Sequence, residues 1–310
     1  MSVFKFPKIL ATNPQIEFIS NVNFNGYSLS VLREDTIHPK VSGNKYRKLK
    51  YNLIEARKLE QDTLLTFGGA YSNHIAAVAS AGKMHGFKTV GIIRGEELSE
   101  KINENPTLTF AKSCGMELHF ISRTTYKMKD SLEFKATLKS DFGDFYLLPE
   151  GGTNQLAVKG CEEILSEATK RYDYICVPVG TGGTMAGIVE GAQPHQSVIG
   201  YSALKGTFQK ELVQKFSEKQ NYSITDSYCF GGYAKIDSSL VRFINEFNDQ
   251  TGMILDPVYT GKMMYGIVAM MKNKYFEKNS HILAIHTGGL QGIEGMNQYL
   301  KKKNAPQINL

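Results

Sequence analysis

The chain has 310 residues, of which 42% are apolar and 21% charged, and its formal net charge is +6. This composition is typical of a globular protein with room for one large domain or two modest ones. Lysines and acidic residues alternate along the chain, so we expect no nucleic-acid partner. No apolar run reaches the roughly 20 residues that cross a bilayer, so we expect no membrane partner either.

Four cysteines, Cys114, Cys161, Cys176 and Cys229, are far apart and form no C-x-x-C motif. We therefore expect reduced, mostly buried thiols and neither a disulfide framework nor a metal site. The first residues, "MSVFKFPKIL", lack the longer apolar region and the cleavage site of a signal peptide. A cytoplasmic location is the expectation that follows.

After the first forty residues, short β-rich runs alternate with helical patterns. The runs and patterns in chain order are 63–68, a helix over 73–86, 88–95, 106–115, 117–122, 145–152, a helix over 154–170, 173–180, a helix after 181–184, 197–204, 281–289 and a last helix over 293–303. This rhythm predicts an α/β fold with parallel strands. Breaks near 59–62 and at the turn-rich "PEGGTN" of 149–154 predict a large domain of residues 1–58 and 153–310, with a small α/β domain of residues 59–152 inserted.

A glycine-rich turn follows the run 173–180 and leads into a helix. It consists of Gly180, Thr181, Gly182, Gly183 and Thr184. Backbone N–H groups and the helix dipole make such a turn suitable for a phosphate, although a plain strand-to-helix turn has the same pattern. The spacing fits neither G-x-G-x-x-G nor G-x-x-x-x-G-K-[ST], so a dinucleotide and a nucleoside triphosphate are disfavoured. A single phosphate on a smaller molecule remains.

Two other glycine-rich loops, "FGGAYSNH" and "HTGGLQG", also follow β-rich runs. In the first, Ser72 is the expected N-cap of a helix, with Asn73 and His74 in its first turn. A third stretch, "SGNKYRKL", begins a helix near Lys45 with basic residues, where the helix dipole favours an anion. Loops at the carboxyl ends of parallel strands gather at one edge, so we expect one ligand site there.

Over nearly its full length the chain resembles the pyridoxal-phosphate enzymes of the tryptophan-synthase-β fold type (fold type II). Within them it is most similar to the group of 1-aminocyclopropane-1-carboxylate (ACC) deaminase and D-cysteine desulfhydrase. Five motifs in order carry the resemblance: "SGNKYRKL", "GGAYSNH", "VGTGGTMAG", "DPVYTGK" and "HTGGL". The resemblance implies two domains, each with a largely parallel sheet flanked by helices, a pyridoxal 5'-phosphate cofactor and a homodimer.

The resemblance also implies roles for residues that hold the cofactor. Lys45 would bond covalently to it, and Lys48 with the turn from Gly180 to Thr184 would hold its phosphate. Asn73 would donate to the phenolic oxygen of the ring, because an amide donates without adding charge. Tyr259 would pack near the ring, with Thr260 and Thr287 also against the cofactor.

On the substrate side the resemblance places Asn73, His74, Tyr233, Thr287 and Gly288. Ser72 would handle protons or bind the substrate carboxylate, and a simple helix cap is the alternative for it. Lys45, Ser72 and Tyr259 are the expected catalytic residues. His74 and His286 either support the site or are ordinary neutral histidines, and we do not expect them to be catalytic.

Thr260 and Thr287 separate the two activities of the group. The ACC deaminases carry glutamate and leucine at these places, and a carboxylate can keep the ring nitrogen protonated whereas a hydroxyl cannot. We therefore expect α,β-elimination from a small amino acid such as D-cysteine, giving pyruvate, ammonia and hydrogen sulfide. ACC deamination to 2-oxobutanoate and ammonia is the alternative. A cysteine-synthase-type β-replacement and a non-catalytic phosphate-binding protein remain open, and "GGAYSNHIAA" lacks the glutamine and arginine usual in this motif, which leaves the substrate open.

Overall fold

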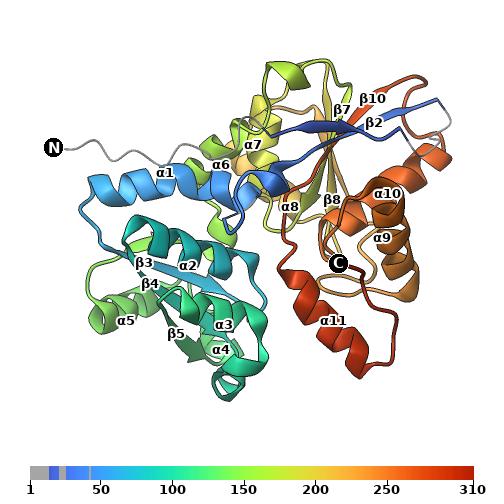
Figure 1. Cartoon of the computed structure of the whole chain (residues 1–310). Helices are drawn as coiled ribbons and strands as arrows, with labels where there is room; N and C mark the ends of the chain where they lie inside the picture. The colour runs from blue at the N-terminus through green and yellow to red at the C-terminus, as the bar shows by residue number, and fades with distance from the viewer. Residues whose placement is uncertain (1–13, 21–25, 42) are drawn as a thin grey trace.

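Two separate β-sheets organise the chain in the computed structural model, which describes residues 14–20, 26–41 and 43–310 (Figure 1). The larger sheet has the strand order β1-β2-β10-β7-β8-β9 and the smaller one β5-β4-β3-β6. All neighbouring strands are parallel except β1 and β2. The predicted α/β fold with two largely parallel sheets is therefore confirmed.

The strands are β1 (Ile16–Phe18), β2 (Ser28–Leu32), β3 (Thr63–Gly68), β4 (Lys88–Arg94), β5 (Met116–Ile121), β6 (Tyr146–Leu148), β7 (Tyr174–Val179), β8 (Ser197–Ser202), β9 (Tyr222–Thr225) and β10 (His281–Ile285). The α-helices are α1 (Asn44–Lys58), α2 (Asn73–His85), α3 (Pro106–Ser113), α4 (Arg123–Tyr126), α5 (Leu132–Phe142), α6 (Gln155–Glu162), α7 (Gly183–Gly191), α8 (Gln209–Phe216), α9 (Ser238–Thr251), α10 (Thr260–Lys272) and α11 (Gly292–Lys302). Short 3-10 helices are η1 (Glu34–Thr36), η2 (Glu96–Glu104), η3 (Glu150–Gly152) and η4 (Glu167–Thr169).

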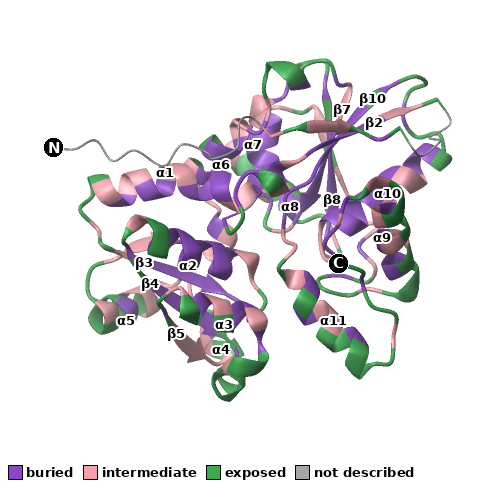
Figure 2. Ribbon diagram, in the orientation of Figure 1, coloured by how far each residue is buried: buried purple, intermediate pink, exposed green. Residues whose placement is uncertain are grey.

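The larger sheet is buried on both faces, as its apolar strands require (Figure 2). In β10, Ile282 and Ala284 belong to the core that includes α9 and α10, whereas Leu283 and Ile285 belong to the core that includes α6 and α7. Side chains alternate between the two faces of a strand, so one apolar run supplies both cores. Helices on both faces leave the strand ends as the place for a ligand.

The smaller sheet lies in the lower left lobe of Figure 1 and is built only from strands between Thr63 and Leu148. The core between this sheet and α2 also contains Leu49 and Leu53 of α1, a helix that precedes these strands in sequence. The helix therefore packs across the break expected near residue 59. The boundaries 1–58, 59–152 and 153–310 stay a prediction.

The helix expected over 154–170 is shorter than the sequence pattern indicated. Helix α6 ends at Glu162, and the 3-10 turn η4 follows it. The Ser166 backbone N–H donates to Thr169 Oγ1 at 3.0 Å, and that hydroxyl donates to Ser166 O at 2.7 Å. Hydroxyl side chains that bond nearby backbone groups compete with helical hydrogen bonds, which accounts for the early end.

Three of the four cysteines, Cys161, Cys176 and Cys229, are buried free thiols, and Cys114 is partly buried. Among the described helices, none combines the length and the apolar character needed to span a membrane.

A buried ion pair ties η1 to the start of α1. The Arg47 guanidinium donates to both carboxylate oxygens of Glu34, at 2.9 and 2.7 Å. Both side chains are buried, with 6% and 0% of their surface exposed. Because the pair is bidentate, it fixes the direction in which α1 leaves η1.

Replacing Glu34 with alanine removes both hydrogen bonds to the buried Arg47 guanidinium and leaves only the more distant Glu163 carboxylate, 3.8 Å away, to balance its charge. We expect Glu34→Ala to lower the free energy of unfolding by about 3–5 kcal/mol. Urea unfolding of the cofactor-free protein, followed by circular dichroism, measures this loss. Glu55→Ala is the control, because Glu55 is partly exposed and pairs at 3.6 Å with the exposed Lys58. This substitution should cost less than about 1 kcal/mol. Equal losses in the two variants would contradict the prediction.

Candidate active site

Two lysines from the first turn of α1 point at one backbone carbonyl. Lys45 Nζ donates to Gly151 O at 3.3 Å, and Lys48 Nζ donates to the same oxygen at 3.0 Å and to Thr153 Oγ1 at 3.1 Å. Residues three apart share a face of a helix, which explains why both reach the same place. The "PEGGTN" turn therefore forms one wall of the site.

Both lysines are in an environment that disfavours their charge. Burial and the nearby Lys48 ammonium lower the pKa of Lys45 well below its ordinary value, and burial lowers the pKa of Lys48. Among the ion pairs of residues 14–20, 26–41 and 43–310, none gives either lysine a carboxylate partner. The site therefore suits an anion beside Lys48 and a nucleophilic, neutral amine at Lys45.

The predicted glycine-rich turn faces these lysines. Helix α7 begins at Gly183 after Gly182, whose φ is +96° and which supplies no side-chain cap. A Cβ on Gly183 would lie 2.6 Å from Thr153 Oγ1, and Thr181 Oγ1 is 2.8 Å from that same oxygen. Thr153 Oγ1 therefore contacts both the Lys48 ammonium and the glycine-rich turn. The uncapped N–H groups at the start of α7 lie beside this cation.

Asn44, the first residue of α1, connects the two walls. Its side-chain amide donates to Thr184 Oγ1 at 2.8 Å. Its backbone N–H donates to Thr287 O at 3.3 Å, on the loop after β10. Gly43 makes this approach possible, because a Cβ there would lie 1.9 Å from Thr287 O.

The predicted cap at the start of α2 is confirmed. Ser72 Oγ accepts the Ile75 N–H at 3.3 Å. Asn73 Oδ1 accepts from Gln291 Nε2 at 2.7 Å, so its amide nitrogen is the end that is left to donate. Thr287, Asn73 and Lys45 line one cavity with Lys40, Asn44, Ala77, Gly289 and Gln291.

His74 is a buried histidine whose ring nitrogens have no hydrogen-bond partner within the described residues. Its ring lies against Gly152, where a Cβ would be 2.7 Å from Cε1. Burial lowers its pKa well below the ordinary value, and Lys45 and Lys48 lower it further. The imidazole is therefore neutral near pH 7, and it adds no positive charge to the site.

Tyr259 and Tyr233 meet beside the glycine-rich turn. Their ring centroids are 6.2 Å apart with the planes inclined by 65°. Tyr259 lies against Gly180, where a Cβ would be 3.0 Å from Cε1 of the ring. Tyr233 is 47% exposed, so this side of the pair faces solvent. Burial, with Tyr233 as the next cause, raises the pKa of the Tyr259 phenol well above its ordinary value.

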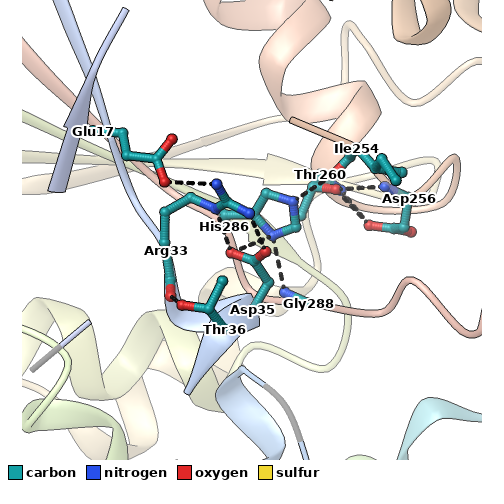
Figure 3. A network of polar contacts seen from close by, with 9 residues as sticks. All are labelled: Glu17, Arg33, Asp35, Thr36, Ile254, Asp256, Thr260, His286 and Gly288. Atoms are coloured by element: carbon teal, nitrogen blue, oxygen red, sulfur yellow. Dashed lines mark hydrogen bonds and ion pairs between the residues drawn. The ribbon is translucent and has the colours of Figure 1, made fainter. Parts of the chain in front are cut away.

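Thr260 is held by a carboxylate that our sequence reasoning did not consider (Figure 3). Asp256 Oδ1 accepts the Thr260 hydroxyl at 2.7 Å and the Thr260 N–H at 2.7 Å. Asp256 Oδ2 accepts the backbone N–H groups of Val258 and Tyr259, both at 2.9 Å. The only proton of the Thr260 hydroxyl is therefore committed to Asp256, and the hydroxyl can offer a ligand only a lone pair.

His286 is a buried histidine with a hydrogen-bond partner at each ring nitrogen (Figure 3). Its Nε2 lies 2.8 Å from Ile254 O, a carbonyl that can only accept, so Nε2 carries the proton. Its Nδ1 accepts the Gly288 N–H at 3.3 Å and lies 3.4 Å from Asp35 Oδ1. This ring fixes the loop that holds Thr287 and Gly288.

The structure brings the five motifs together: three follow the carboxyl ends of β3, β7 and β10, as expected for parallel sheets, and two lie at the starts of α1 and α10. Four contributors were missed by sequence reasoning: Asn44, Thr153, Asp256 and Gln291. Asp256 lies four residues before Thr260 and just before a proline. An aspartate at this spacing is typical of a side chain that closes a turn, so the sequence contains a signal for this contact. The sequence pattern around Thr153 indicates only a turn.

The chain matches the sequence profile of the family described as "Pyridoxal-phosphate dependent enzyme" over residues 21–288. It belongs to this family. The site fits the cofactor on its own evidence, because Lys48 and the uncapped start of α7 suit a phosphate and Lys45 offers an amine to an aldehyde. The expected pyridoxal 5'-phosphate is confirmed as the cofactor of this family.

The chain is also similar to proteins with two kinds of name. A solved structure, the "ACC deaminase homologue", superposes with a TM-score of 0.81 at 27% identity over 95% of each chain. The Arabidopsis thaliana "Bifunctional D-cysteine desulfhydrase/1-aminocyclopropane-1-carboxylate deaminase, mitochondrial" is 30% identical over 87% of this chain and 74% of its own. "D-cysteine desulfhydrase" of Klebsiella pneumoniae strain 342 is 25% identical over 96% of this chain and 98% of its own. The chain therefore shares its fold and family with proteins of both names.

Gly182→Ala should weaken cofactor binding. The new Cβ would lie 2.9 Å from Leu212 Cδ2 and would need a φ of +96°, so the turn should shift away from a phosphate. We expect the Kd for pyridoxal phosphate to rise about tenfold or more, the cost of one weakened charged hydrogen bond. Absorbance titration of the cofactor-free protein measures it.

The matched control is Gly252→Ala, which has the same kind of backbone strain at φ +69° and no neighbour within 4 Å of the new Cβ. Its Kd should stay unchanged. An unchanged Kd in Gly182→Ala would mean that the phosphate lies elsewhere.

Proposed function

We propose that this protein catalyses α,β-elimination from a small β-substituted amino acid, in the manner of a D-cysteine desulfhydrase. With one water consumed, D-cysteine would give pyruvate, ammonia and hydrogen sulfide, so atoms and charges balance. The bound cofactor supplies an electron sink for the pair left when the α-proton departs. The remaining work, holding the cofactor and moving protons, falls to the residues of the chain.

We assign Lys45 as the residue that binds the cofactor covalently, because its environment favours the neutral amine. Lys48, Thr153 and the turn from Gly180 to Thr184 hold the phosphate. Asn73 keeps its amide nitrogen free to donate to the phenolic oxygen of the ring, because its Oδ1 already accepts from Gln291. Tyr259 packs against the ring, and the neighbouring Tyr233 lies on the substrate side.

Lys45 and Ser72 are the candidates for proton transfer. A lysine whose pKa is lowered can take the α-proton near neutral pH. Ser72 Oγ accepts the Ile75 N–H as the cap of α2, and its O–H can also donate to a substrate carboxylate at the same helix end. His74, Thr287 and Gly288 complete the substrate side.

The observation that carries the choice of reaction is the Asp256–Thr260 pair. Because the Thr260 proton is used by Asp256, this side chain cannot protonate a ring nitrogen placed beside it. A ring without that proton is a weaker electron sink. Expelling a thiolate after loss of the α-proton needs a weaker sink than opening an unactivated cyclopropane does, which favours elimination over ACC deamination.

ACC deamination is the second candidate, because relatives of both names share the fold and one of them carries both names. β-Replacement of the cysteine-synthase type ranks below it, and product analysis with and without an added thiol separates it from elimination. A non-catalytic role ranks last, and it would leave amino acids unchanged. We also propose a cytoplasmic homodimer, which size-exclusion chromatography and cell fractionation test.

Borohydride reduction should fix the cofactor on Lys45. The neighbouring Lys48 donates to Gly151 O and Thr153 Oγ1 and Lys50 pairs with Glu163, so neither is placed to compete. Peptide mapping by mass spectrometry should find the pyridoxyl group on Lys45, and Lys45→Ala should lack the visible absorbance. A label on Lys48 or Lys50 would overturn the assignment.

The wild-type protein should favour D-cysteine or a similar β-substituted amino acid over ACC. We expect a kcat/KM for pyruvate release at least about tenfold above that for 2-oxobutanoate release, which is about 1.4 kcal/mol of transition-state binding. A screen of D- and L-amino acids and ACC for keto-acid release measures both. A preference for ACC would replace our proposal with the deaminase alternative.

Thr260→Glu combined with Thr287→Leu should raise the ratio of ACC to D-cysteine turnover by about tenfold or more. The new carboxyl would lie beside buried Asp256, and two such carboxyls cannot both ionise readily. One of them would hold a proton for the ring nitrogen. The control, Thr260→Gln with Thr287→Leu, has the same size without the acid, so an equal rise in the control would refute this explanation.

A further inference from the structure

Lys262, in the first turn of α10, is a buried lysine that the proposed reaction does not use. Only 1% of its surface is exposed. Its Nζ donates to Cys229 O and Gly232 O, both at 2.8 Å, and lies 3.5 Å from Ala203 O. An ammonium has three N–H donors and no acceptor, so three converging carbonyl oxygens match it.

The cation holds together three separate parts of the chain. Ala203 follows β8, Lys262 lies in α10, and Cys229 and Gly232 lie in the connection between β9 and α9. No carboxylate pairs with Lys262 among the ion pairs of the described residues. Burial lowers the pKa of Lys262 to about 8, which still leaves it mostly charged at pH 7.

The connection that it holds carries Tyr233. We name residues 226–237 the tyrosine loop. Its backbone is unusual, since Phe230 and Ala234 have φ values of +52° and +54°, and Gly231 and Gly232 have +86° and +119°. Non-glycine residues with positive φ cost of order 1–3 kcal/mol and persist only where other contacts hold them. The two carbonyls bound by Lys262 are such contacts.

Lys262 also links the two tyrosines of the site. The Gly232 carbonyl that it binds belongs to the peptide that leads into Tyr233. Tyr259 immediately precedes α10, the helix that carries Lys262. One ammonium therefore connects the helix beside Tyr259 with the peptide beside Tyr233, and the two rings meet at 6.2 Å.

We propose that Lys262 is a positioning residue: its ammonium acts as a built-in cation that holds the tyrosine loop and sets Tyr233 against Tyr259 on the substrate side. The role of Tyr233 toward the substrate rests on the proposed function, whereas the ordering of the loop does not. It follows that a small free cation can take the place of the ammonium when the side chain is truncated.

Limited trypsin digestion of the cofactor-free protein tests the ordering of the loop. Lys235 is an exposed cleavage site within it. Lys262→Ala should be cut after Lys235 about tenfold faster or more than the wild type, reflecting lost charged hydrogen bonds. Methylammonium or potassium chloride should restore protection, because each small cation can contact the carbonyl oxygens directly. Tetramethylammonium chloride at equal ionic strength should not, because its four methyl groups keep its charge away from those oxygens and make it too large.

Lys219→Ala is the matched control. Lys219 Nζ also donates to two backbone carbonyls, Glu190 O at 2.5 Å and Ala192 O at 2.9 Å, but at the carboxyl end of α7, away from the glycine-rich turn. This variant should leave cleavage after Lys235 unchanged. If Lys262→Ala does not fold, Lys262→Gln, which keeps most of the volume without the charge, replaces it. Unchanged cleavage in the variant, or no recovery of Lys262→Ala with the small cations, would overturn the proposal.

Steady-state kinetics separate this proposal from the proposed function. With the cofactor bound and its absorbance unchanged, Lys262→Ala should raise KM for the amino acid about tenfold, more than it lowers kcat, and methylammonium should restore KM. Faster cleavage that small cations reverse, together with an unchanged KM, would uphold the ordering of the loop and refute the substrate role of Tyr233. Faster cleavage with a raised KM would support both.

Discussion

The site depends on one electrostatic constraint: two lysines of α1 converge on the single carbonyl oxygen of Gly151, and no carboxylate of the described part of the chain pairs with either of them. Burial lowers the pKa of both lysines, and the Lys48 ammonium lowers that of Lys45 further. An anion beside Lys48 would offset its buried charge. The neutral His74 beside them adds no charge of either sign. The glycine-rich turn leads into the uncapped start of α7, whose backbone N–H groups add hydrogen-bond donors beside Lys48, where we expect the anion.

The buried Glu34–Arg47 pair supports this arrangement from outside the site. Arg47 lies between Lys45 and Lys48 in sequence but points to the other side of α1. By fixing the start of the helix, the pair determines where the two lysines face. α1 also packs on the core of the smaller sheet, so a shift between the sheets would move the lysines relative to Thr153 and the glycine-rich turn.

The sequence predicted the parallel α/β architecture, because apolar strands and helical patterns alternate clearly, and it predicted the Ser72 cap. It also identified the motifs, since each combines glycine with polar residues at the start of a helix or after a strand. It could not show that Thr153 joins Lys48, or that Asp256 takes the proton of Thr260. Those contacts depend on backbone positions of positive φ and on side-chain directions that no periodic pattern encodes. The early end of α6 was missed because a local Ser166–Thr169 hydrogen bond overrides the helical pattern.

Gly43 adds a constraint on how the specificity of this site can change. With a Cβ only 1.9 Å from Thr287 O, any other residue there would separate the segment before Lys45 from the loop of Thr287. The backbone on both sides of the cavity is thus joined with no side chain between. Under the proposed function, adaptation to a new substrate would therefore proceed through the side chains at positions such as 260 and 287, while the distance between the segment before Lys45 and residue 287 stays constant. Two enzymes with different substrates can in this way share one backbone.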